Sequence, residues 1–166
     1  MRFELADEAD PLNLGRAFGE RWRRGGIITL AGDLGSGKTT FCRGLLRSLG
    51  WEGHVKSPTF TLVEPYEDSR LVLPVYHFDL YRLAHPEELE YSGAMDYFED
   101  TTLCLIEWPE NGQDFLPTAD FAVTLSVVRR GRVAEVEPGS SDAAAVLAAL
   151  RVRVADWRTP LWRCSG

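Results

Sequence analysis

The chain has few lysines, few cysteines and no long apolar run. None of its 166 residues fall in an apolar stretch near the ~20 residues that a membrane-spanning helix needs. The first residues lack the basic end and apolar core of a signal peptide. Cys42, Cys104 and Cys164 are scattered and form neither a disulfide framework nor a metal-binding pattern. We therefore expect a cytoplasmic protein without membrane attachment.

Positive charge is scarce as well. The net charge of −7 argues against independent tight binding to DNA or RNA. Of the 18 basic residues, only Lys38 and Lys56 are lysines. Because arginine is used everywhere else, these positions indicate sites where a compact ammonium group differs in function from a guanidinium group.

The hydrophobic pattern predicts one α/β domain over residues 1–155, with a central mixed β-sheet flanked by helices. Asp10-Pro11 is typical of a helix start, with Asp10 as the N-cap. Pro74 suggests an edge or a bulge in the strand that contains it, and Ser141-Asp142 can cap a last helix. Residues 156–166 form a C-terminal tail that the pattern does not place. The other expected elements are strands at 27–31, 71–80, 103–106, 121–127 and 133–137, and helices after residue 37 and from residue 85.

A glycine-rich loop joins the first of these strands to the helix that follows. Residues 32–39 read G-D-L-G-S-G-K-T, which matches the phosphate-loop pattern G-x-x-x-x-G-K-[ST]. Glycines let backbone N–H groups face a phosphate, and the helix N-terminus points at the same anion. In this pattern Lys38 contacts the β- and γ-phosphates, and the Thr39 hydroxyl ligates Mg²⁺. The sequence therefore predicts a P-loop NTPase-like domain.

Two acidic residues are candidates for a second magnesium ligand. Glu107 ends the apolar run 103–106, and Asp79 ends the strand predicted before it. The residues alone do not decide between them, because a carboxylate at the end of a strand can also cap a helix or pair with arginine.

Two further segments have a functional and a purely structural interpretation. Residues 57–61 read S-P-T-F-T and follow the phosphate-loop helix, where nucleotide switches often have a hydroxyl that senses the γ-phosphate. The same residues also suit an ordinary proline turn. Arg132, at the tip of a predicted hairpin, could reach the phosphates or the base, or be an exposed turn residue.

The chain contains four segments that recur together in one family: GDLGSGKTTF at 32–41, VKSPTFTLV at 55–63, YHFDLYRL at 76–83 and LIEWPE at 105–110. The loop alone would be generic, and the other three segments carry the resemblance. Together the four resemble the TsaE family, the bacterial ATPases that assist threonylcarbamoyladenosine formation on transfer RNA. The resemblance extends over about residues 5–137 and does not include the segment from Ser140 onward.

The resemblance implies a role for each of these site residues. Lys38 and Asp79 would be catalytic, with Asp79 orienting the hydrolytic water. Thr39 and Glu107 would ligate Mg²⁺, and Trp108 would lie beside the metal. The nucleotide-binding residues would be Glu8, Gly35, Ser36, Gly37, Lys38, Thr39, Thr40 and Arg132.

The resemblance also implies a function. The chain would be an Mg²⁺-dependent ATPase, weak alone, that drives a conformational cycle in an assembly of the TsaB and TsaD subunits. It would meet transfer RNA only indirectly, through that assembly. Two alternatives remain: a small-molecule kinase, with Arg129, Arg130 and Arg132 in a lid, and a nucleotide-dependent switch without useful hydrolysis. A GTPase is disfavoured because neither asparagine, Asn13 or Asn111, begins the N-K-x-D that reads guanine.

Overall fold

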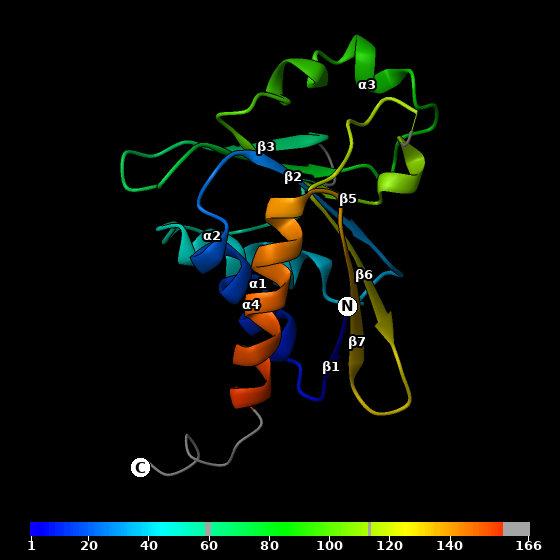
Figure 1. Ribbon diagram of the computed structural model, residues 1–166. Helices are drawn as coiled ribbons and strands as arrows, with labels where there is room; N and C mark the ends of the chain where they lie inside the picture. Colours follow the sequence, from blue (N-terminus) through cyan, green and yellow to red (C-terminus); the bar gives the residue numbers. More distant parts are fainter. Residues whose placement is uncertain (59–60, 113, 158–166) are drawn as a thin grey trace.

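A seven-stranded mixed β-sheet forms the centre of the computed structural model, which describes residues 1–58, 61–112 and 114–157 (Figure 1). The strand order is β1-β7-β6-β2-β5-β4-β3. The four strands β6, β2, β5 and β4 pair in parallel, and the outer three pair antiparallel. The predicted α/β class with a mixed sheet is therefore confirmed. The strands are β1 (Arg2–Leu5), β2 (Gly26–Ala31), β3 (Val63–Tyr66), β4 (Val75–Asp79), β5 (Leu103–Glu107), β6 (Phe121–Val127) and β7 (Arg132–Pro138).

Helices cover both faces of this sheet (Figure 1). On one face lie α1 (Asp10–Arg21), α2 (Lys38–Ser48) and α4 (Ser141–Trp157). The other face carries the short helix α3 (Glu88–Tyr91) and the 3₁₀ turns η1 (Ala94–Tyr97) and η2 (Pro109–Asn111). Within the described ranges, no helix has both the length and the apolar character required to cross a membrane.

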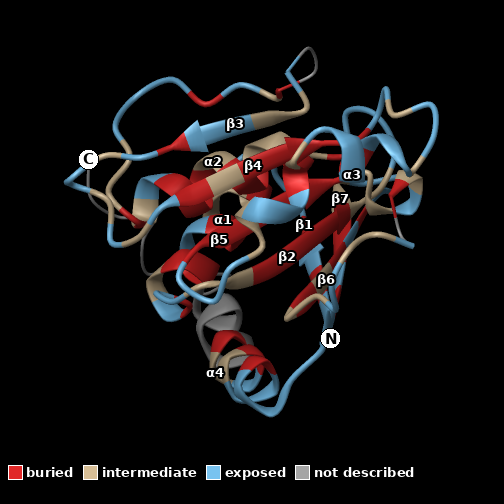
Figure 2. Ribbon diagram, turned by 90° about the horizontal axis from the view of Figure 1, so that it is seen from above, coloured by how far each residue is buried: buried red, intermediate tan, exposed pale blue. Residues whose placement is uncertain are grey.

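The alternation of side chains along the strands sorts the core into two clusters. Leu30 and Leu105 point into the larger cluster, under α1, α2 and α4. Ile27 and Ile106 point into the smaller cluster on the opposite face. The central strands are buried along most of their length (Figure 2). By the same alternation, the residues at positions 77, 79 and 107 lie on the face that α2 covers.

Helices α1 and α2 pack so closely that their backbones touch at glycines. A Cβ atom at Gly15 would lie 2.0 Å from the carbonyl oxygen of Phe41, and one at Gly44 would lie 2.0 Å from that of Leu12. Apolar side chains such as Phe18 and Phe41, with ring centroids 5.3 Å apart, fill the space beside these contacts. Because α2 begins at Lys38, this packing fixes where the glycine-rich loop ends.

Several local predictions need correction. Pro74 lies just before β4, which is an interior strand. The edge strand next to β4 is β3, which contains Pro65 and was not predicted. The sequence pattern also missed β1. The N-cap of α1 is Ala9, whereas the Asp10 carboxylate accepts a hydrogen bond from the N–H of Asp7.

The last helix also differs from its prediction. The Ser140 hydroxyl, not residues 141–142, accepts the hydrogen bond from the N–H of Ala143 that caps α4. The helix extends to Trp157, two residues into the segment that the pattern left unplaced. Residues 158–166, including Cys164, lie outside the described residues, as do residues 59 and 60 of the expected switch segment.

Gly15→Ala should destabilise the protein, although alanine normally favours a helix by about 1 kcal/mol over glycine. The new methyl group would collide with backbone atoms of α2, which cannot move aside as a side chain can. We expect the free energy of unfolding in urea to fall by about 1–3 kcal/mol. Arg16→Ala, at an exposed neighbouring position, is the control and should change it by less than about 0.5 kcal/mol. Equal stability of Gly15→Ala and the unmodified protein would contradict the close packing of α1 and α2.

Candidate nucleotide-binding site

The glycine-rich loop, residues 32–37, connects β2 to α2 at the carboxyl edge of the parallel strands. Gly32, Gly35 and Gly37 have φ angles of +132°, +79° and +110°, values that other residues rarely adopt. Gly37 is the N-cap of α2, and no side chain of the described residues caps this end of the helix. The first N–H groups of α2 are therefore left for a ligand or for water.

Two buried side chains at the junction of the loop and α2, Ser36 and Lys38, carry hydrogen-bond donors. The Ser36 hydroxyl is buried and has no hydrogen-bond partner among the described residues. Lys38, only 4% exposed, donates from Nζ to the carbonyl oxygens of Gly32 (2.6 Å) and Asp33 (3.0 Å). The uncapped helix end and the buried ammonium group together fit an anion.

Burial lowers the pKa of Lys38 below its ordinary value of 10.5, because the charged form loses hydration. The carboxylates of Glu107 and Asp79 oppose this effect. The ammonium group also lies 3.9 Å from the centre of the Trp108 ring, a cation–π contact. An anionic ligand here would stabilise the protonated lysine further.

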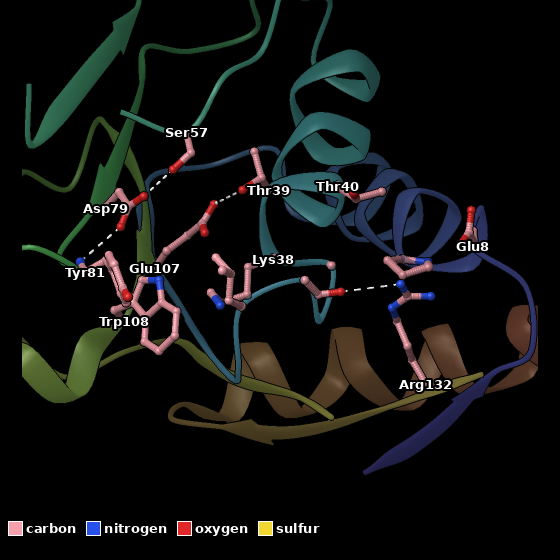
Figure 3. A pocket seen from close by; sticks show the side chains of 14 residues that line it. Glu8, Lys38, Thr39, Thr40, Ser57, Asp79, Tyr81, Glu107, Trp108 and Arg132 are labelled. Carbon is pink, nitrogen blue, oxygen red and sulfur yellow. Dashed lines mark hydrogen bonds between the residues drawn. The ribbon is translucent and has the colours of Figure 1, made fainter. Parts of the chain in front are cut away.

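The second pair of groups comes from α2 and β5. The Thr39 hydroxyl donates to Oε1 of Glu107 at 2.8 Å (Figure 3). Glu107 is the last residue of β5 and is only 3% exposed. A hydroxyl and a carboxylate, both oxygen donors, are the ligand types that Mg²⁺ prefers.

Asp79, the other candidate acid, lies beside Glu107 on the neighbouring strand. The parallel register of β4 and β5 pairs these two residues directly. The Ser57 hydroxyl donates to Oδ2 of Asp79, and the N–H of Tyr81 donates to Oδ1 at 3.0 Å. Thr39 therefore contacts Glu107, whereas Asp79 is held by the expected switch segment and by the loop after its own strand.

Trp108 has an unusual backbone conformation, with φ of +59°, immediately after Glu107. This conformation turns the chain out of β5 and directs the ring toward Lys38 on one side. On the other side the ring packs against Tyr81, with centroids 4.9 Å apart. A non-glycine residue in the left-handed region is often found at functional sites.

The remaining predicted residues lie at the other end of the cavity (Figure 3). Arg132, from β7, donates to the Gly35 carbonyl oxygen at 3.4 Å, and its Nε is buried without a partner among the described residues. Glu8 lies before α1. The Thr40 hydroxyl accepts a bond from Arg43 at 3.4 Å. This end therefore combines one acidic and one basic side chain from segments distant in sequence.

All these groups surround one cavity of about 330 Å³. Of the predicted site residues, only Ser36 does not line it. Sequence reasoning missed Pro11 and Leu34 in its wall, since an apolar side chain carries no chemical signature. It also missed His77, which binds Glu107, although a polar residue two positions before Asp79 on a strand must share its face. The predicted lining residues are Glu8, Gly35, Gly37, Lys38, Thr39, Thr40, Asp79, Glu107 and Arg132.

The sequence of the chain matches a known protein family. The model of the family "Threonylcarbamoyl adenosine biosynthesis protein TsaE" matches residues 5–133. The chain belongs to the TsaE family. TsaE proteins take part in the biosynthesis of threonylcarbamoyladenosine on transfer RNA, and the resemblance noted in the sequence is thereby confirmed.

Individual TsaE proteins agree with this assignment. The tRNA threonylcarbamoyladenosine biosynthesis protein TsaE of Haemophilus influenzae is 48% identical over 126 residues, which cover 73% of this chain and 78% of that protein. The TsaE protein of Nostoc sp. is 40% identical over 139 residues, 81% of this chain and 83% of its own. The crystal structure of Bacillus subtilis YdiB superposes with a TM-score of 0.76 at 25% identity, covering 92% of this chain and 95% of that one.

Lys38→Met should alter how stability depends on pH. Because the folded-state pKa of Lys38 is lowered, the unfolded chain binds more protons than the folded protein as pH approaches 10.5 from below. The free energy of unfolding should therefore increase as pH rises through the folded-state pKa of Lys38. Lys38→Met should lack this increase.

Urea unfolding of the unmodified protein and of the variant, near pH 7 and near pH 10, measures the effect. The exposed Lys56 provides the control, since Lys56→Met should keep the pH dependence of the unmodified protein. A difference in stability between Lys38→Met and the unmodified protein that stays constant over this range would contradict the lowered pKa.

Proposed function

We propose that this TsaE protein binds ATP with Mg²⁺ in the cavity and hydrolyses it to support threonylcarbamoyladenosine formation on transfer RNA. One observation carries the proposal. The uncapped N-terminus of α2, the buried Lys38 ammonium and the Thr39–Glu107 oxygen pair all open onto the same cavity. These are the groups that a magnesium-bound triphosphate requires.

The loop would hold the phosphates. The glycine conformations let the backbone approach closely, so that the N–H groups at the start of α2 can donate to phosphate oxygens. Lys38 would exchange its two backbone acceptors for phosphate oxygens, which are stronger partners because they are charged.

Thr39 and Glu107 would hold Mg²⁺, since their side-chain oxygens lie 2.8 Å apart in the first turn of α2 and at the end of β5. The bound ion would neutralise charge on the phosphates. Asp79 lies opposite Glu107 in the sheet and lines the same cavity, and it would orient the attacking water. In such a site, rate acceleration comes from positioning and electrostatics.

We further propose that hydrolysis serves a partner assembly of TsaB and TsaD, and that the transfer to transfer RNA occurs there. The cavity is lined by groups for one nucleotide, and no separate acceptor site is apparent from its lining residues. Of the three arginines expected in the lid of a kinase, Arg132 lines the cavity, whereas Arg129 and Arg130 are exposed and do not. These positions favour an ATPase over a small-molecule kinase.

Phosphate release from ATP with Mg²⁺ tests the ATPase proposal. The protein is measured alone, with the TsaB–TsaD pair, and with that pair and transfer RNA. We expect a low rate alone and a higher rate with the partners. A rate that the partners do not change would contradict their role, and phosphate transfer to a metabolite instead of water would favour the kinase.

Glu107→Gln and Asp79→Asn should separate the metal ligand from the water-orienting residue. Glu107→Gln removes a metal ligand and should weaken Mg²⁺-dependent nucleotide binding by about tenfold or more. Asp79→Asn should leave that binding nearly unchanged and lower turnover by about 10²- to 10⁴-fold. Glu110→Gln, at an exposed position outside the cavity lining, makes the same change of charge and should affect neither quantity.

Calorimetric titration with an ATP analogue and single-turnover hydrolysis measure the two quantities. If Asp79→Asn weakened Mg²⁺-dependent binding and Glu107→Gln did not, the ligand would be Asp79 and the assignment would be wrong.

A further inference from the structure

His77 is a fully buried polar residue in the middle of β4 that the proposed mechanism does not use. Its Nε2 lies 2.9 Å from Oε1 of Glu107, also buried. Its Nδ1 has no hydrogen-bond partner among the described residues. Burying an imidazole is costly unless its ring nitrogens form hydrogen bonds, and the contact with Glu107 is the one that Nε2 makes here.

The sheet register explains how His77 reaches Glu107. His77 pairs with Leu105 in the parallel ladder, and Glu107 is two residues further along β5. Both side chains therefore lie on the face covered by α2. The ring of His77 stacks on that of Tyr66 from the edge strand β3, with centroids 6.5 Å apart and planes 27° apart. The direction of the imidazole is thus set by its strand and its neighbour.

The orientation of the Glu107 carboxylate depends on its hydrogen-bond donors. The terminal torsion of a glutamate has no sharp intrinsic preference, and at 3% exposure little water can hold it. Oε1 accepts from Thr39 at 2.8 Å and from His77 at 2.9 Å. The Cys42 thiol lies 4.0 Å away and is a weak third donor.

These two donors differ in what else they do. The Thr39 hydroxyl is itself a candidate magnesium ligand and lines the cavity. His77 does not line the cavity and has no other hydrogen-bond partner among the described residues. Because the carboxylate can only accept, Nε2 of His77 is the donor in this contact. His77 is therefore the donor that remains dedicated to Glu107 whatever binds at Thr39.

We propose that His77 is a positioning residue for the metal site: it holds Oε1 of Glu107, and so directs the carboxylate toward the cation beside Thr39. This inference rests on the proposed function, because it concerns the ion bound with the nucleotide. Residues that orient a ligating group typically change metal affinity by about 10- to 100-fold when they are removed.

Mn²⁺ binding, followed by electron paramagnetic resonance in the presence of a non-hydrolysable ATP analogue, tests the proposal. His77→Phe keeps a planar ring but removes the donor, and should raise the Mn²⁺ dissociation constant by about 10- to 100-fold. His77→Gln has an amide donor that can reach the position of Nε2, and should recover the affinity to within about fivefold. Affinity for the analogue in excess chelator should change less than about twofold in both variants, because phosphate contacts do not involve His77.

Val75→Ala is the matched control for packing. Val75 is fully buried on the same strand and the same face, but contacts no group of the site through a hydrogen bond. It should lower the unfolding temperature without changing Mn²⁺ affinity. If His77→Phe does not fold, His77→Leu, which also lacks a donor, replaces it, and unchanged Mn²⁺ affinity in that variant would likewise overturn the proposal.

The outcomes separate this inference from the proposed function. Loss of Mn²⁺ affinity in His77→Phe, with recovery in His77→Gln, would support it. Unchanged affinity in His77→Phe, or an equal loss in His77→Phe and Val75→Ala, would overturn it and leave the proposed function intact. If the unmodified protein bound no Mn²⁺ with the analogue, both would be wrong.

Discussion

Strand β5 pairs in parallel with β2 on one side and with β4 on the other. This arrangement brings the carboxyl ends of three strands to the same edge of the sheet. In this register Glu107 lies beside both Leu30 and Asp79. The loop after β2 then leads directly into α2, so that Thr39 meets Glu107. Ligands of open α/β sheets bind at this edge because strand ends and helix starts converge there.

The electrostatics of the site follow from this geometry. Lys38 is buried near the two carboxylates Glu107 and Asp79, which partly compensate the cost of removing its charge from water. The donors at the start of α2 remain without a side-chain cap. The protein therefore maintains a polar and incompletely satisfied cavity, and the rigid contact between α1 and α2 holds it in place. A bound triphosphate with its cation would complete both sets of interactions.

Sequence reasoning recovered those parts of the fold and site that depend on local patterns. The buried runs of β2 and β5, and the loop with its lysine and threonine, each have a signature within about ten residues. The short edge strands β1 and β3 were missed because four residues with one exposed face carry little periodic signal. Pro74 misled the prediction because a proline just before a strand and one inside an edge strand look alike in sequence.

The partners of each site residue could not be predicted, because they depend on register between distant strands. The residues alone left Glu107 and Asp79 as alternatives for the metal. In the structure the two acids have different contacts, since the Thr39 hydroxyl donates to Glu107 and the Ser57 hydroxyl donates to Asp79. His77 carried no recognisable motif of its own, and its relation to Glu107 is visible only once β4 and β5 are paired.

A crystal structure of the protein with Mg²⁺ and a non-hydrolysable ATP analogue would show whether this cavity binds a triphosphate and its cation. We expect the triphosphate along residues 32–39, with Lys38 moved from the Gly32 and Asp33 carbonyl oxygens to phosphate oxygens. We also expect the cation beside Thr39 and Glu107. A cation held by Asp79 without Glu107, or a nucleotide bound outside this cavity, would contradict this expectation.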